Sequence, residues 1–88
     1  MKIKEGFMLR DVAGSAVVVP MGKAAVDFNG MVTLNEMGAF LWKHLEEETT
    51  EEDLLKAVLD EYDATEEQAK QGIEKFLKTL RDENFIDE

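Results

Sequence analysis

The chain contains one segment in which an alternating strand runs without a loop into an amphipathic helix, Met31-Val32-Thr33-Leu34-Asn35-Glu36-Met37-Gly38-Ala39-Phe40-Leu41. Val32 and Leu34 fall on one face of an extended chain, and Met31 and Thr33 fall on the other. Asn35 is a good helix N-cap, because its side-chain oxygen can accept hydrogen bonds from the first free amides of the helix. The backbone changes direction within one residue, which predicts a rigid junction between strand and helix.

The residues before this junction predict further short antiparallel strands. Residues 7–12 and 15–20 are rich in apolar side chains and flank Ala13-Gly14, a predicted tight turn. Residues 24–28 and 31–34 flank Asn29-Gly30, a strong hairpin signal. We therefore expect an N-terminal antiparallel sheet of three to four short strands.

Three amphipathic helices are predicted after the strands. The first spans about residues 36–46, the second begins after Thr50, and the third begins after Thr65 with the capping-box pattern Thr65–Gln68. Helices of this length are marginal alone and need an apolar surface to pack on. We therefore predict an α+β fold, similar to a winged helix-turn-helix, with all three helices on one face of the sheet and a single domain over residues 1–88.

The 88 residues carry a net charge of −10, and the excess acid lies in the second half. Residues 1–45 contain five Lys or Arg and four Asp or Glu, whereas residues 46–88 contain five and sixteen. The acidic half serves either solubility or a basic partner surface, and it repels phosphate, which argues against nucleic acid and anionic membranes as partners. With no cysteine, no long apolar run and no signal-peptide pattern, the chain is expected in the cytoplasm.

Reactive side chains are few. His44 is the only histidine and Ser15 the only serine, and neither has the neighbours of a nucleophilic site. The acidic runs at residues 46–48 and 60–63 lack the alternating ligands and the glycine of a calcium loop. The sequence therefore predicts no catalytic residues, no metal site and no cofactor.

Binding is the function that remains. If residues 31–34 form an edge strand, their unpaired amides and carbonyls are a template for an added strand, because neither lysine nor proline blunts them. If the strand is internal or covered, it only helps to build the core. The residues leave both alternatives open.

The third helix would form the wall beside such an edge. We expect Ile73, Phe76 and Leu80 to face the core and Leu77 to lie on the flank, where it either lines a groove or completes the core. A second set of side chains shares one side of the helix and is expected to contact charged groups of a guest strand: Lys70, Glu74 and Arg81.

Several segments together resemble the PqqD family, the peptide-binding proteins of pyrroloquinoline quinone (PQQ) biosynthesis and of other modified peptides. The resemblance lies in Met31–Asn35, in Ala39-Phe40-Leu41, in Val17-Val18-Val19-Pro20, in the threonine-capped acidic second helix and in the closing residues 80–86. None of these is a catalytic signature, but they follow one another in the expected order.

The resemblance implies a RiPP recognition element, which binds the leader of a ribosomally made precursor peptide as an added strand. It also implies a modifying enzyme, often a radical SAM (S-adenosylmethionine) protein, as the second partner. Residues 21–30 look longer than the tight connection expected in the family, which favours a modified-peptide pathway other than quinone biosynthesis. The peptide-binding residues that we expect are Phe28, Met31, Val32, Thr33, Leu34, Lys70, Ile73, Glu74, Leu77 and Arg81.

Two further classes share this architecture. A winged-helix transcription regulator needs a basic helix in the DNA groove, whereas the second and third helices here both begin with acidic turns. A structural subunit that pairs its own edge would form a weak homodimer.

Overall fold

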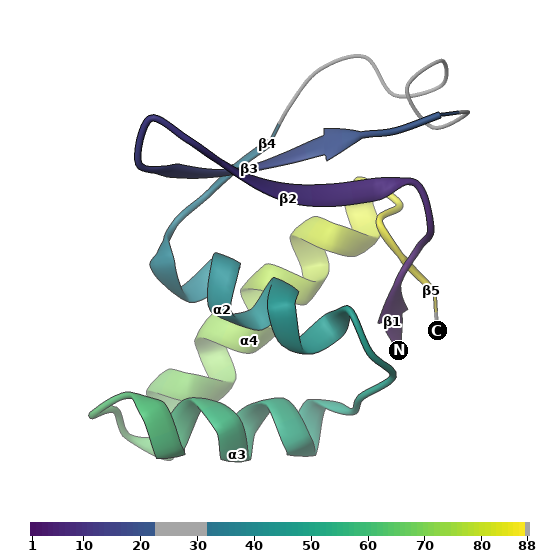
Figure 1. Cartoon of the computed structure of the whole chain (residues 1–88). Helices are drawn as coiled ribbons and strands as arrows, with labels where there is room; N and C mark the ends of the chain where they lie inside the picture. The colour runs from purple at the N-terminus through teal and green to yellow at the C-terminus, as the bar shows by residue number, and fades with distance from the viewer. Residues whose placement is uncertain (23–31, 88) are drawn as a thin grey trace.

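The two hairpin strands and the three helices lie where their sequence patterns predict them. The computed structural model describes residues 1–22 and 32–87 (Figure 1). The elements follow in the order β1 (Lys2–Ile3), β2 (Phe7–Val12), β3 (Ser15–Pro20), β4 (Val32–Leu34), α2 (Glu36–Leu45), α3 (Glu51–Glu61), α4 (Glu66–Asp82) and β5 (Ile86–Asp87).

β2, β3 and β4 form an antiparallel sheet in that order. Ala13 and Gly14 connect β2 to β3 with φ values of 53° and 84°, the positive pair that a type I′ hairpin turn requires. The predicted hairpin is therefore confirmed with both strand boundaries. The second predicted hairpin, with its strand at residues 24–28 and its Asn29-Gly30 turn, lies outside the described residues.

Each helix begins at the cap that the sequence predicts. The side-chain oxygen of Asn35 accepts from the Gly38 amide at 2.7 Å, and the Thr50 hydroxyl accepts from the Asp53 amide at 3.2 Å. Thr65 and Gln68 form the complete capping box, each side chain accepting from the other residue's amide at 3.1 Å. These bonds satisfy amides that a helix start otherwise leaves without partners.

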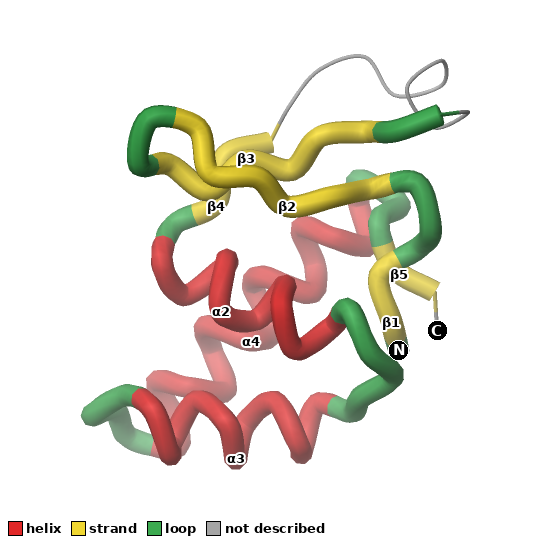
Figure 2. Tube along the Cα trace, in the orientation of Figure 1, coloured by secondary structure: helices red, strands yellow, loops and turns green. Residues whose placement is uncertain are grey.

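The helices lie on one side of the three-stranded sheet, as predicted (Figures 1 and 2). α2 and α4 lie nearest the sheet, α2 contacts β4, and α3 packs against α4 on the side away from the strands. The fold is therefore α+β, with the helical layer covering the inner face of the sheet.

The core contains a pair of aromatic rings from distant parts of the chain. Trp42 of α2 and Phe85 are both fully buried, with ring centroids 6.0 Å apart, and Phe7 lies 4.6 Å from Phe85. Most of the surrounding core side chains are aliphatic, namely Ile3, Val18, Leu41, Leu45, Leu54, Val58, Ala69, Ile73, Leu77, Leu80 and Ile86.

A second, two-stranded sheet joins the two ends of the chain, which the sequence did not predict. β1 pairs antiparallel with β5, with Lys2 opposite Asp87 and Ile3 opposite Ile86 (Figure 1). Strands of two residues are too short to show an alternating pattern. The side chains of Ile3 and Ile86 are instead buried in the same core cluster as Phe85.

Candidate functional site

β4 is the edge of the three-stranded sheet. It pairs with β3 on one side, with Val32 opposite Val18 and Leu34 opposite Ala16. On its other side no strand from residues 1–22 or 32–87 pairs with it. An edge of this kind presents main-chain donors and acceptors to an extended chain.

A groove of about 280 Å³ lies between β4, the start of α2 and one face of α4. Its strand side is apolar, because Val32 and Leu34 are half-buried and point toward the helices, whereas Thr33 is exposed. The described residues that line the groove are Val32, Thr33, Leu34, Asn35, Met37, Gly38, Gly72, Lys75, Phe76 and Thr79.

Gly38 sets how closely α2 approaches β4 and α4. A Cβ built on Gly38 would lie 3.1 Å from Asn35 Oδ1, 3.2 Å from Phe76 Cε1 and 3.3 Å from Leu34 Cβ. These distances are shorter than an ordinary van der Waals contact. Glycine at this position therefore keeps the capping side chain, the edge strand and the Phe76 ring together at one end of the groove.

Gly72 has the opposite role. A Cβ built on Gly72 would meet no atom within 4 Å, so the missing side chain leaves open space in the groove wall. Beside it, the Thr79 hydroxyl donates to the Lys75 backbone carbonyl at 3.1 Å, which keeps the Thr79 side chain against its own helix.

The structure corrects the expected positions of two α4 side chains. Leu77, expected on the flank, is fully buried in the core, while Phe76, expected in the core, is half-buried and lines the groove. Both residues continue the apolar stripe of α4, and neighbours on a helix differ by only about 100°. The choice between them depends on how the helix is rotated against the sheet.

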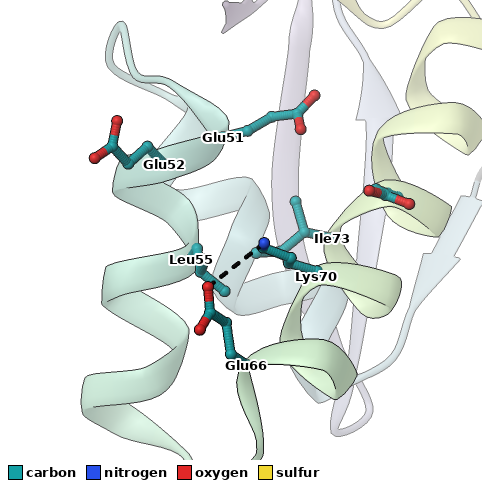
Figure 3. Close-up of a pocket in the computed structure, with 7 residues that line it drawn as sticks. Glu51, Glu52, Leu55, Glu66, Lys70 and Ile73 are labelled. Carbon is teal, nitrogen blue, oxygen red and sulfur yellow. Dashed lines mark ion pairs between the residues drawn. The ribbon is translucent and has the colours of Figure 1, made fainter.

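The predicted charged side of α4 faces α3 and not β4. Lys70 and Glu74 line a separate cavity of about 440 Å³ between α3 and α4, which Leu55 and the buried Ile73 also line (Figure 3). Lys70 is paired there with Glu66 at 3.4 Å.

Arg81 lies on the same side of α4. Its guanidinium pairs with Glu51 of α3 at 3.7 Å. About 200° of helix rotation separates position 70 from position 72, which places the predicted charged side roughly opposite the groove. Among the expected site residues, the groove therefore gathers Val32, Thr33 and Leu34. Phe28 and Met31 lie outside the described residues.

Sequence reasoning missed the α4 residues that line the groove. Gly72, Lys75, Phe76 and Thr79 are spaced i, i+3, i+4 and i+7, a second stripe beside the core stripe at positions 69, 73, 77 and 80. The groove face of α4 could have been recognised from the sequence by three residues that flank the core stripe: the small Gly72, the aromatic Phe76 and Thr79.

Two further titratable side chains, His44 and Tyr62, lie beside the ring of Phe40. His44 is exposed and its ring lies 4.6 Å from that of Phe40. Partial burial raises the pKa of Tyr62, and the carboxylates of Glu36 and Glu61 raise it further, so the phenol stays neutral at ordinary pH. Within residues 1–22 and 32–87, no three acidic or histidine side chains gather in a way that could hold a metal ion.

No helix within residues 1–22 and 32–87 is both long enough and apolar enough to span a membrane.

The fold and the groove define a class of small α+β modules in which the edge strand of a sheet faces a helix across a groove. Residues 15–86 match the family model of coenzyme PQQ synthesis protein D (PqqD), so the chain belongs to the PqqD family. The predicted family is thereby confirmed.

A solved structure has the same fold. It is described as TbiB1 in complex with the TbiA(beta) leader peptide, and it superposes with a TM-score of 0.78 at 20% sequence identity. The match covers 99% of this chain and 95% of that one. No curated protein sequence matches the chain.

Proposed function

We propose that this protein binds the leader of a ribosomally made precursor peptide by strand addition at β4 and presents it to a modifying enzyme. The observation that carries the proposal is the position of the β4 edge directly beside the α4 groove, since no strand within residues 1–22 and 32–87 pairs with that edge. Membership of the PqqD family supports it, and so does the fold shared with a protein described in complex with a leader peptide.

The two parts of the site would supply different components of recognition. Main-chain hydrogen bonds to β4 give affinity for any extended chain, whereas side-chain pockets choose the sequence and its register. The half-buried Val32 and Leu34 and the Phe76 ring offer an apolar surface for alternate side chains of the guest. Ordering a disordered leader costs several kcal/mol, so moderate affinity is expected.

The protein is proposed to act without catalysis of its own. The second partner would be an enzyme that modifies the core of the peptide, of the radical SAM type, and both would work in the cytoplasm. The family also serves quinone biosynthesis, but the long segment at residues 21–30 favours another modified peptide. The assignment predicts that a short peptide gene and a radical-enzyme gene lie beside the gene of this protein.

The test is a titration of isotope-labelled protein with the synthetic leader encoded by the neighbouring peptide gene. We expect the amide signals of Val32, Thr33 and Leu34 to shift together with those of Gly72 and Phe76. A scrambled leader of equal composition is the control, and it should leave them in place. Measurable binding that leaves all β4 amides unshifted contradicts strand addition.

The edge position of β4 in the described sheet also favours a second candidate, because two copies of β4 can pair with each other. Sedimentation of the peptide-free protein separates the two candidates. A monomer that binds the leader supports peptide capture. A dimer that the leader does not dissociate supports the self-pairing subunit.

A further inference from the structure

The cations of α4 differ in whether they have a carboxylate partner. Lys70 pairs with Glu66 at 3.4 Å, Lys78 with Asp82 at 3.3 Å and Arg81 with Glu51 at 3.7 Å. The Lys75 side chain makes no ion pair or hydrogen bond with any described residue. Lys75 is therefore the one cation of this helix whose charge is not neutralised nearby.

The sequence explains this difference. Lys70 has Glu66 and Glu74 at the i−4 and i+4 positions, where side chains on a helix meet. The corresponding neighbours of Lys75 are Gln71 and Thr79, and Gly72 and Lys78 lie three residues away. Although the chain has 20 acidic residues, none is three or four positions from Lys75, so Lys75 has no intrahelical carboxylate partner.

Lys75 also lies at the groove. It is the only charged side chain among the described residues that line the cavity beside β4, a lining that also includes Thr33, Phe76 and Thr79. A strand added to β4 would shield this ammonium group from water on one side. An ion pair formed there would be stronger than one on an open surface, because the effective dielectric constant is lower.

We infer that Lys75 is a specificity-determining residue that selects leader peptides with an Asp or Glu facing α4. The inference rests on the proposed function and deepens it by naming the substrate class. The guest is an extended acidic segment that also carries a bulky apolar side chain, for which the open space beside Gly72 and Phe76 provides room. The net charge of −10 opposes such a guest only weakly, since distant charges are screened beyond about 8 Å at physiological salt.

The first experiment selects binders from a displayed library of random 12-residue peptides on the wild-type protein, on Lys75→Gln and on Lys78→Gln. Lys78 is the matched control, because it lies one turn further on the same helix, is exposed and does not line the groove. Wild type and Lys78→Gln should enrich Asp or Glu at one fixed distance from an apolar residue. Lys75→Gln should keep the apolar preference and lose the acidic one.

The second experiment measures affinity for one selected peptide and for its Glu→Gln analogue. Wild type should bind the acidic form about fivefold to tenfold more tightly, and Lys75→Gln should bind both forms equally. Lys75→Glu should prefer an analogue with Lys in place of Glu, which a merely structural role of Lys75 does not explain. Circular-dichroism melts of each variant establish that it is folded.

The outcomes distinguish a failure of the proposed peptide capture from a failure of the proposed role of Lys75. A library that yields no peptide shifting the β4 amides overturns the proposed function together with this inference. Groove-binding peptides without an acidic preference, or with one that survives in Lys75→Gln, overturn the inference about Lys75 and leave peptide capture standing.

Discussion

Phe76 of α4 lies against Gly38 of α2 so closely that a Cβ at position 38 would be 3.2 Å from the ring atom Cε1. This contact joins the two helices at the end of the groove where β4 becomes α2. The same Cβ would also approach Asn35 Oδ1 and Leu34 Cβ. Any side chain at position 38 must therefore displace the ring, the cap or the strand.

Gly38→Ala should lower the free energy of unfolding by about 1 kcal/mol, since strain from overpacking exceeds the small gain in helix propensity. Gly38→Val should cost about 2 kcal/mol for the same reason. Urea denaturation followed by circular dichroism measures both. Unchanged stability of Gly38→Val would show that the junction adjusts freely.

Gly72→Ala is the same change on a helix face where the added Cβ meets no atom within 4 Å. It should raise the free energy of unfolding by about 0.5–1 kcal/mol, because alanine favours a helix interior more than glycine. Gly72→Leu should leave the fold intact and weaken leader binding at least tenfold by filling the groove. Calorimetric titration checks this, and full binding by Gly72→Leu would place the peptide elsewhere.

Asn35→Ala and Thr65→Ala each remove a helix cap, at a cost of about 1 kcal/mol. Only Asn35 lines the groove and lies at the end of β4. Leader affinity should therefore fall in Asn35→Ala and stay at the wild-type value in Thr65→Ala, although both variants lose similar stability. Equal losses of affinity would indicate that general destabilisation is the cause.

Ala13 occupies a left-handed conformation with φ of 53°, which an L-residue adopts at a cost of about 1 kcal/mol. Ala13→Asn creates the Asn-Gly pair that type I′ turns prefer and should raise the free energy of unfolding by about 0.5–1 kcal/mol. Neither Ala13 nor Gly14 lines the groove beside β4, so leader affinity should not change. A lower melting temperature would count against the assigned turn.

Tyr62 should make stability fall at alkaline pH. Its folded pKa is raised above 10.0 by desolvation and by nearby carboxylates. Between pH 10 and that raised value the folded state therefore binds more protons than the unfolded state. Stability is thus lost as the pH rises above 10. Tyr62→Phe keeps the ring beside Phe40 and should show a shallower decline in urea denaturation between pH 9 and pH 11. Parallel curves would show that the phenol contributes nothing.

Local patterns predicted much of the fold because the relevant interactions lie within a few residues. The caps Asn35, Thr50 and Thr65 each act on an amide three residues away, and each was correctly placed. The Ala13-Gly14 turn likewise specifies its own hairpin. The pairing of β1 with β5 was missed, because it joins residues more than 80 positions apart and leaves no periodic trace in either segment.

The site was predicted less well than the fold. The edge strand residues 32–34 were identified, but the facing surface of α4 was assigned to Lys70, Glu74 and Arg81, which lie on the α3 side. A wide apolar stripe at positions 69, 73, 76, 77 and 80 leaves the helix free to rotate by one residue. The sequence pattern alone does not choose between these rotations.

The β2–β3 hairpin, the starts of the three helices and the family therefore follow from the residues alone, since short-range hydrogen bonding and periodicity depend on residues that are near one another in the sequence. Which stripe of α4 meets β4, and with it the groove position of Phe76 and Lys75, follows from packing in three dimensions. That packing buries Leu77 in the core, and Phe76, about 100° away around the helix, contacts Gly38 at the groove, where the absence of a side chain leaves room for the ring.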